Sequence, residues 1–120
     1  MPDKHDFEIL KADWNKLVEK LNVQFDSELD LQGIIFLIGV QELGRGAQKF
    51  SKDEKQDLMH IATCKLLSYY GLYELRGIDQ QGWPVWELVK KMPPLSLKEQ
   101  DILLKNCVIE YFRDEGIYEI

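Results

Sequence analysis

Residues 31–43 constrain the fold more strongly than any other part of the chain. Their sequence is Leu-Gln-Gly-Ile-Ile-Phe-Leu-Ile-Gly-Val-Gln-Glu-Leu, and at helical spacing its apolar side chains surround the helix instead of forming one stripe. A helix that is apolar on all sides has to be buried. The segment is too short to cross a bilayer, which needs about 20 residues. Other parts of the chain or a partner must therefore cover it.

The composition fits one domain over residues 1–120. The chain is 45% apolar and 30% charged, which is enough to bury a core without disulfides or metal. The first residues contain no apolar signal-peptide run, and no segment reaches membrane length. We therefore expect a cytoplasmic protein with no membrane association.

Charge and cysteine usage narrow the function classes. The formal net charge is -6, which disfavours binding to phosphate backbones, so nucleic acid is not the expected partner. Cys64 and Cys107 lack the paired spacing of a metal site. In a reducing compartment we expect both to be free thiols in or near the core.

Apolar periodicity and helix-end signals predict the secondary structure. Two Ser-x-x-Glu capping boxes start helices at Ser51 and Ser96, and Gly44 and Gly71 stand where helices should end. The predicted helices are at about 4–22, 31–43, 51–70 and 96–115, and a β-hairpin at about 73–89 follows the third. The fold class is therefore mainly α (α+β), a compact bundle of four principal helices with one hairpin.

The hairpin turn contains Asp79 and Gly82, both typical of turns. Pairing Ile78 with Trp83 would place one set of residues on a face that packs against helices: Tyr73, Leu75, Gly77, Pro84, Trp86 and Leu88. The opposite face would then carry Glu74, Arg76, Val85 and Glu87. Ile78, Trp83 and Val85 would form an exposed apolar cluster beside Arg76, which is typical of an interaction surface.

Three short segments resemble a family of small uncharacterised bacterial proteins. They are Gly39-Val40-Gln41-Glu42-Leu43-Gly44, Asp57-Leu58-Met59-His60-Ile61-Ala62 and Gly82-Trp83-Pro84. The resemblance covers about residues 34–90. It implies a helical bacterial domain and assigns no catalytic residue.

A polar site is predicted around residues 51–70. Asp53, Asp57, His60 and Cys64 project from one side of that helix, and Asp57-x-x-His60 has a spacing that can serve a metal ion. We nevertheless expect this side of the helix to be a solvated face, with a metal site as the alternative, because bundle metal sites take ligands from several helices.

Glu42 continues an apolar stripe at a helix C-terminus, where the helix dipole disfavours an anion. We expect a partner for it, namely Arg45, Arg76 or His60. The candidate polar site is therefore Glu42, Arg45, Asp57, His60 and Arg76. It is either a structural ion pair or a poised acid–base group.

The sequence assigns no catalytic residue, metal or cofactor, because no nucleophile elbow or phosphate loop is present. The function we expect is a non-catalytic protein-interaction or regulatory domain that binds a protein partner or forms a homodimer. One alternative is an enzyme or metal-binding protein using Asp57, His60 and Glu42. Another is a winged-helix-like DNA binder, with Lys49 and Lys52 near the phosphates.

Overall fold

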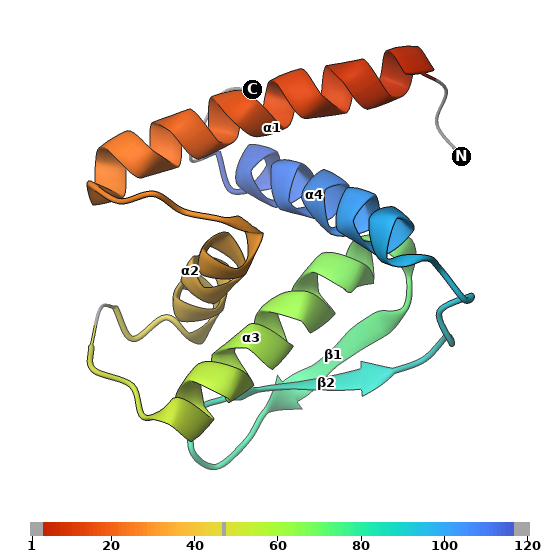
Figure 1. Ribbon diagram of the computed structural model, residues 1–120. Helices are drawn as coiled ribbons and strands as arrows, with labels where there is room; N and C mark the ends of the chain where they lie inside the picture. Colours follow the sequence, from red (N-terminus) through yellow and green to blue (C-terminus); the bar gives the residue numbers. More distant parts are fainter. Residues whose placement is uncertain (1–3, 47, 117–120) are drawn as a thin grey trace. The chain divides into compact units, whose positions relative to one another are not determined.

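The computed structural model describes the backbone of residues 4–46 and 48–116 (Figure 1). The elements in chain order are α1 (Lys4–Phe25), α2 (Leu31–Leu43), α3 (Lys52–Leu67), the short 3-10 helix η1 (Ser68–Tyr70), β1 (Tyr73–Ile78), β2 (Pro84–Leu88) and α4 (Leu97–Asp114). The predicted class is confirmed: four helices, with an antiparallel hairpin between the third and fourth. None of the helices in these two ranges is long and apolar enough to span a membrane.

Local signals set the helix ends. The Ser51 hydroxyl accepts a hydrogen bond from the Glu54 amide at 3.1 Å, and the Glu54 carboxylate accepts one from the Ser51 amide at 2.9 Å. Ser96 and Glu99 form the same capping box at the start of α4. Both boxes satisfy amides that a helix N-terminus otherwise leaves unpaired, as the sequence predicts.

The chain divides into two units, and each is described by itself. The helix pair consists of residues 1–31 and 95–120, with α1 and α4. The central unit consists of residues 32–94, with α2, α3, η1 and the hairpin. The single domain expected over the whole chain stays a prediction.

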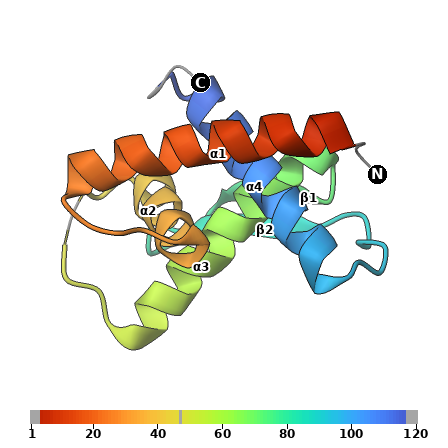
Figure 2. The ribbon, with the colours of Figure 1, turned by 45° about the horizontal axis from the view of Figure 1, so that its top comes forward.

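In the helix pair, α1 lies across α4 (Figure 2). Leu17 and Leu21 on α1 and Val108 and Tyr111 on α4 are fully buried. The Arg113 guanidinium, near the end of α4, lies 3.1 Å from the Asp13 carboxylate on α1. An ion pair therefore adds to the apolar contact between the two helices.

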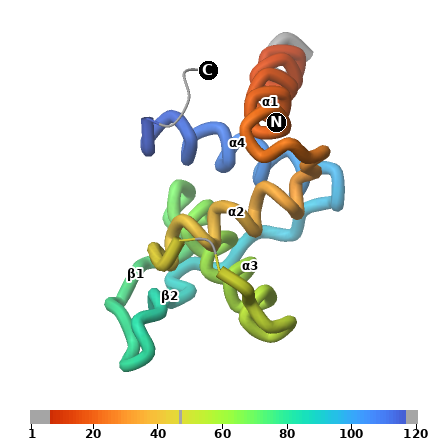
Figure 3. The backbone as a smooth tube through the Cα atoms, turned by 90° about the vertical axis from the view of Figure 1, so that its left-hand side faces the viewer, coloured from red at the N-terminus to blue at the C-terminus, as the bar shows by residue number. Residues whose placement is uncertain are grey.

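In the central unit, α2 lies beside α3, and α3 runs along the hairpin (Figures 1 and 3). Gly39 allows α2 and α3 to approach closely, because a Cβ atom there would lie 2.3 Å from the Leu58 carbonyl oxygen. A buried cluster, which we call the core cluster, extends from this contact to the hairpin. It contains Leu43, Phe50, Leu58 and Ile61, with Phe36, Val40, Trp83 and Trp86 packed against it.

The hairpin register is only partly the predicted one. Tyr73 pairs with Leu88 and Leu75 with Trp86, as expected, but a bulge between Leu75 and Gly77 then shifts the pairing by one residue. Ile78 therefore pairs with Pro84 and not with Trp83. Gly77 permits this shift because its φ of 138° is one that side-chain-bearing residues rarely adopt.

Candidate functional site

The bulge decides which side chains share a face of the hairpin. Directly paired residues lie on the same face, so Ile78 joins Leu75 and Leu88 on the face that carries Trp86. Gly77 pairs with Val85 and leaves this face, contrary to the predicted arrangement. The result is an all-apolar hairpin face that consists of Tyr73, Leu75, Ile78, Pro84, Trp86 and Leu88.

This apolar face is only partly covered. Trp86 is half-buried and packs against the core cluster that α3 contributes to. Leu75 and Leu88 are each 54% exposed, and Ile78 is 71% exposed. We call Leu75, Ile78 and Leu88 the aliphatic patch. The expectation that Leu75 and Leu88 are covered by helices is therefore wrong, because α3 covers the Trp86 part of the face and leaves the patch open.

Trp83 lies where the sequence did not predict it. Displaced from the ladder by the bulge, it is half-buried and packs against the core cluster. Its amide donates to the Asp79 carboxylate at 2.9 Å, which fixes the turn. The prediction that Trp83 is exposed is therefore wrong, and its part in an interaction surface stays a prediction. Val85 and Ile78 are exposed as expected, but the register places them on opposite faces.

The predicted polar residues Asp57 and His60 line a groove between α3 and the hairpin turn. Its volume is about 310 Å³, and its lining is Glu54, Asp57, His60, Ile61, Asp79, Gln81, Trp83 and Pro84. Arg45 belongs to the same region, since its guanidinium donates to the Gln81 carbonyl and lies 5.9 Å from the Trp83 ring centroid. The structure therefore groups three of the five predicted polar-site residues around one groove.

Several polar groups of this groove already have structural partners. The Asp79 carboxylate accepts two backbone hydrogen bonds in the turn. Glu54 belongs to the capping box, and its hydrogen bonds with Ser51 hold the pKa of its carboxyl below the ordinary value. Both carboxylates are therefore better explained as stabilising elements of the fold than as acid–base groups.

His60 and Cys64 form a contact one helical turn apart. The Cys64 sulfur lies 3.6 Å from His60 Nε2, and Cys64 is buried, which places it inside and not on the predicted solvated stripe. Burial raises the pKa of the Cys64 thiol to about 11, so the thiol stays protonated at neutral pH. In the described ranges, no three His, Cys, Asp or Glu side chains gather as metal ligands.

Arg76 lies outside the groove. Its guanidinium pairs with Glu87 and lies 3.0 Å from Glu74, on the hairpin face opposite the aliphatic patch. These two carboxylates raise its pKa. Glu42 is half-buried in the last turn of α2 and is not part of the groove lining. The partner expected for Glu42 stays a prediction.

Both cysteines are free and buried, as the sequence predicts. Burial, and secondarily the Glu110 carboxylate, raises the pKa of the Cys107 thiol to about 12. Neither thiol therefore has the lowered pKa that marks a reactive cysteine.

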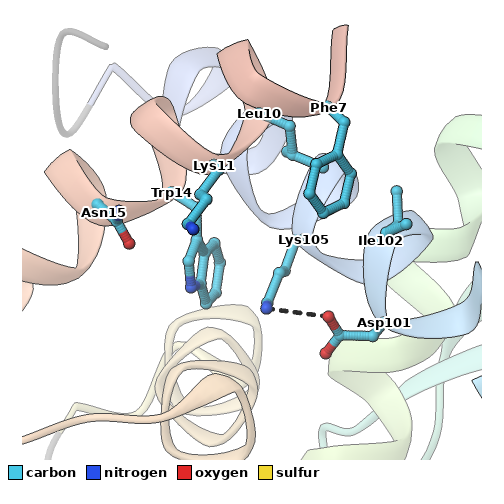
Figure 4. Close-up of a pocket in the computed structure, with 8 residues that line it drawn as sticks. All are labelled: Phe7, Leu10, Lys11, Trp14, Asn15, Asp101, Ile102 and Lys105. Atoms are coloured by element: carbon cyan, nitrogen blue, oxygen red, sulfur yellow. Dashed lines mark ion pairs between the residues drawn. The ribbon is translucent and has the colours of Figure 1, made fainter. Parts of the chain in front are cut away.

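The sequence did not predict one cavity that the structure contains. It lies between α1 and α4 and is lined by Phe7, Leu10, Lys11, Trp14, Asn15, Asp101, Ile102 and Lys105 (Figure 4). The helical spacing of Phe7, Leu10 and Trp14 indicated a core stripe. Helical spacing alone does not show whether two packed helices leave a cavity between them.

Comparison with protein-family models, curated proteins and solved structures finds no match for this chain. The resemblance to small bacterial proteins therefore stays a prediction.

Proposed function

We propose that this chain is a non-catalytic protein-interaction domain that binds a second copy of itself through the aliphatic patch. One observation carries the proposal. Leu75, Ile78 and Leu88 lie on one face of a two-stranded sheet, and each is more than half exposed. Adjoining exposed aliphatic side chains on a sheet mark surfaces that another polypeptide covers.

The energetics indicate a weak association. Burying the exposed half of a leucine-sized side chain is worth about 1 kcal/mol. A two-fold contact uses the three patch residues of each protomer, which gives about 6 kcal/mol. Association itself costs about 4–15 kcal/mol. At the lower end of that cost the patch leaves about 2 kcal/mol, whereas a dissociation constant of about 1 mM needs about 4 kcal/mol. We therefore expect a weak dimer with a dissociation constant of about 1 mM, in which polar contacts at the rim supply about 2 kcal/mol more.

Charge favours a protein partner over nucleic acid. The groove at the start of α3 carries the carboxylates of Glu54, Asp57 and Asp79, which would repel phosphates. In a winged-helix DNA binder this part of the helix would face the nucleic acid. A protein surface has no such requirement.

We also propose a cytoplasmic location. Cys64 and Cys107 are both free thiols. Free cysteine pairs are typical of reducing compartments, where disulfides do not persist.

Sedimentation equilibrium tests the proposal. The wild type should associate between about 20 µM and 1 mM, and the double variant Leu75→Ser/Leu88→Ser should bind at least about tenfold more weakly. Leu97→Ser is the matched control, because Leu97 is 84% exposed on α4, outside the hairpin. It should associate like the wild type. A wild type that is monomeric throughout this range, or a double variant that associates equally well, would reject the proposal.

A further inference from the structure

The cavity between α1 and α4, which we call the α1–α4 pocket, has the features of a small-molecule site. Its volume is about 320 Å³, within the range of about 300–1,000 Å³ for ligand pockets. One wall comes from α1 and the other from α4, both within the helix pair. The lining combines apolar side chains with a few polar groups, which is the usual composition of a ligand pocket.

Aromatic rings form much of the α1 wall. Phe7 and Trp14 extend from α1 toward α4, and Leu10 lies between them along the helix (Figure 4). Positions seven residues apart on a helix are separated by about 10 Å along its axis. The aromatic wall of the pocket therefore extends over about two turns of α1. Leu10 is buried and Ile102 half-buried, so the apolar surface continues onto α4.

The charges at the pocket are positive although the chain is acidic. Lys11 and Lys105 against Asp101 leave one net positive charge in the lining, and the Lys98 ammonium lies 5.8 Å from the Phe7 ring centroid. The lining thus carries one net positive charge in a chain with a net charge of -6. Such a local excess favours an anionic ligand.

Lys105 connects the aromatic wall with the charged wall. Its ammonium lies 2.9 Å from the Asp101 carboxylate and 5.4 Å from the Trp14 ring centroid. The Asp101 pair and the ring hold the ammonium at the pocket (Figure 4). An ammonium ion has three donors, so Lys105 can bond an incoming carboxylate while it keeps Asp101.

We propose that the α1–α4 pocket binds a small aromatic carboxylate. Its ring lies against Phe7, Leu10 and Ile102, and its carboxylate accepts hydrogen bonds from Lys105 and Lys11. This site is independent of the aliphatic patch, since the two lie in different units of the chain.

The test compares naphthoate with naphthamide, its neutral isostere, by nuclear magnetic resonance titration. Naphthoate should shift the Trp14 indole N–H signal with saturation at about 1 mM or below. The indole signals of Trp83 and Trp86, which lie in the central unit, should stay unshifted and serve as internal controls. Naphthamide should bind at least about fivefold more weakly.

Two variants test which lysines bind the carboxylate of the ligand. Lys11→Gln/Lys105→Gln should bind naphthoate at least about fivefold more weakly and bind naphthamide as the wild type does. Lys16→Gln is the control, because Lys16 is an exposed lysine of α1 outside the pocket lining. It should bind both compounds like the wild type. Equal affinity for naphthoate and naphthamide, an unshifted Trp14 signal, or unchanged naphthoate binding by the double variant would each overturn the proposal.

Discussion

The close approach of α2 and α3 makes Gly39→Ala a sharp test of the central unit. A Cβ atom at Gly39 would lie 2.3 Å from the carbonyl oxygen of Leu58 and 2.8 Å from its carbonyl carbon. Both atoms belong to the α3 backbone, so no side chain can rotate away. The two helices would have to separate at a point where Leu58 is fully buried.

The sign of the effect follows from two opposing contributions. Alanine stabilises a helix by about 1 kcal/mol relative to glycine, because its unfolded chain is less flexible. Overpacking a tight core costs about 1–3 kcal/mol, and a backbone clash lies near the top of that range. Gly39→Ala should therefore lower the free energy of unfolding by about 2 kcal/mol. In a domain of this size that lowers Tm by about 6–12 °C.

Thermal and urea unfolding followed by circular dichroism measure this change. Gln41→Ala is the matched control, because Gln41 is exposed on the same helix and its substitution should stay within about 0.5 kcal/mol. If Gly39→Ala kept or raised the wild-type Tm, the close approach of α2 to α3 would be refuted.

Four further predictions concern the polar and thiol groups. The pKa of Glu54 is lower in the folded protein than the ordinary value of 4.5. The contribution of this carboxylate to the free energy of unfolding is therefore complete above pH 4.5 and is lost as pH falls through the folded-state pKa. Glu54→Gln should reduce this loss, which thermal melts between neutral and acidic pH measure. Burial raises the pKa of the Cys64 thiol from 9.0 to about 11 in the folded protein. The contribution of the protonated thiol to the free energy of unfolding is therefore complete below pH 9 and declines as pH rises toward 11. Cys64→Ala should lessen this decline, which thermal melts at alkaline pH measure. Both Cys64 and Cys107 should react with Ellman's reagent only at the rate of unfolding, and rapid reaction of the native protein would contradict their burial. Arg45→Gln should lower stability by about 0.5–1 kcal/mol and alter Trp83 fluorescence, whereas unchanged emission would exclude the cation–π contact.

Features that depend on local sequence were predictable. The capping box of Ser51 and Glu54 needs only two side chains three residues apart, and the structure forms it as predicted. Gly44 and Gly71 end their helices with φ values of 74° and 73°, again from local sequence alone. The first half of the hairpin register, from Tyr73 to Leu75, was also correct.

The second half of the hairpin could not be derived in the same way. A bulge is a choice between two pairings of similar local cost, and the packing of Trp83 against the core cluster favours the shifted one. Gly77 within a strand was the available signal, since glycine at such positions often marks a bulge. Taking it into account would have moved Ile78 to the face of Leu75.

In the candidate sites, too, local sequence predicted some features and not others. Sequence spacing brought Asp57 and His60 to one side of a helix, and both line the groove. The ion pairs of Arg76 with Glu74 and Glu87 depend on cross-strand pairing, which helix spacing does not report. The α1–α4 pocket depends on how two distant segments pack, so no local pattern of α1 reveals it.

A dilution series of amide spectra tests directly whether this chain binds a second copy of itself through the hairpin. Amide signals of an isotope-labelled sample are compared between about 20 µM and 1 mM, the range in which weak association shows. We expect concentration-dependent shifts for residues 73–78 and 84–88, centred on Leu75, Ile78 and Leu88, while the signals of α1 stay unchanged. Spectra that do not change with concentration, or shifts confined to residues outside the hairpin, would contradict it.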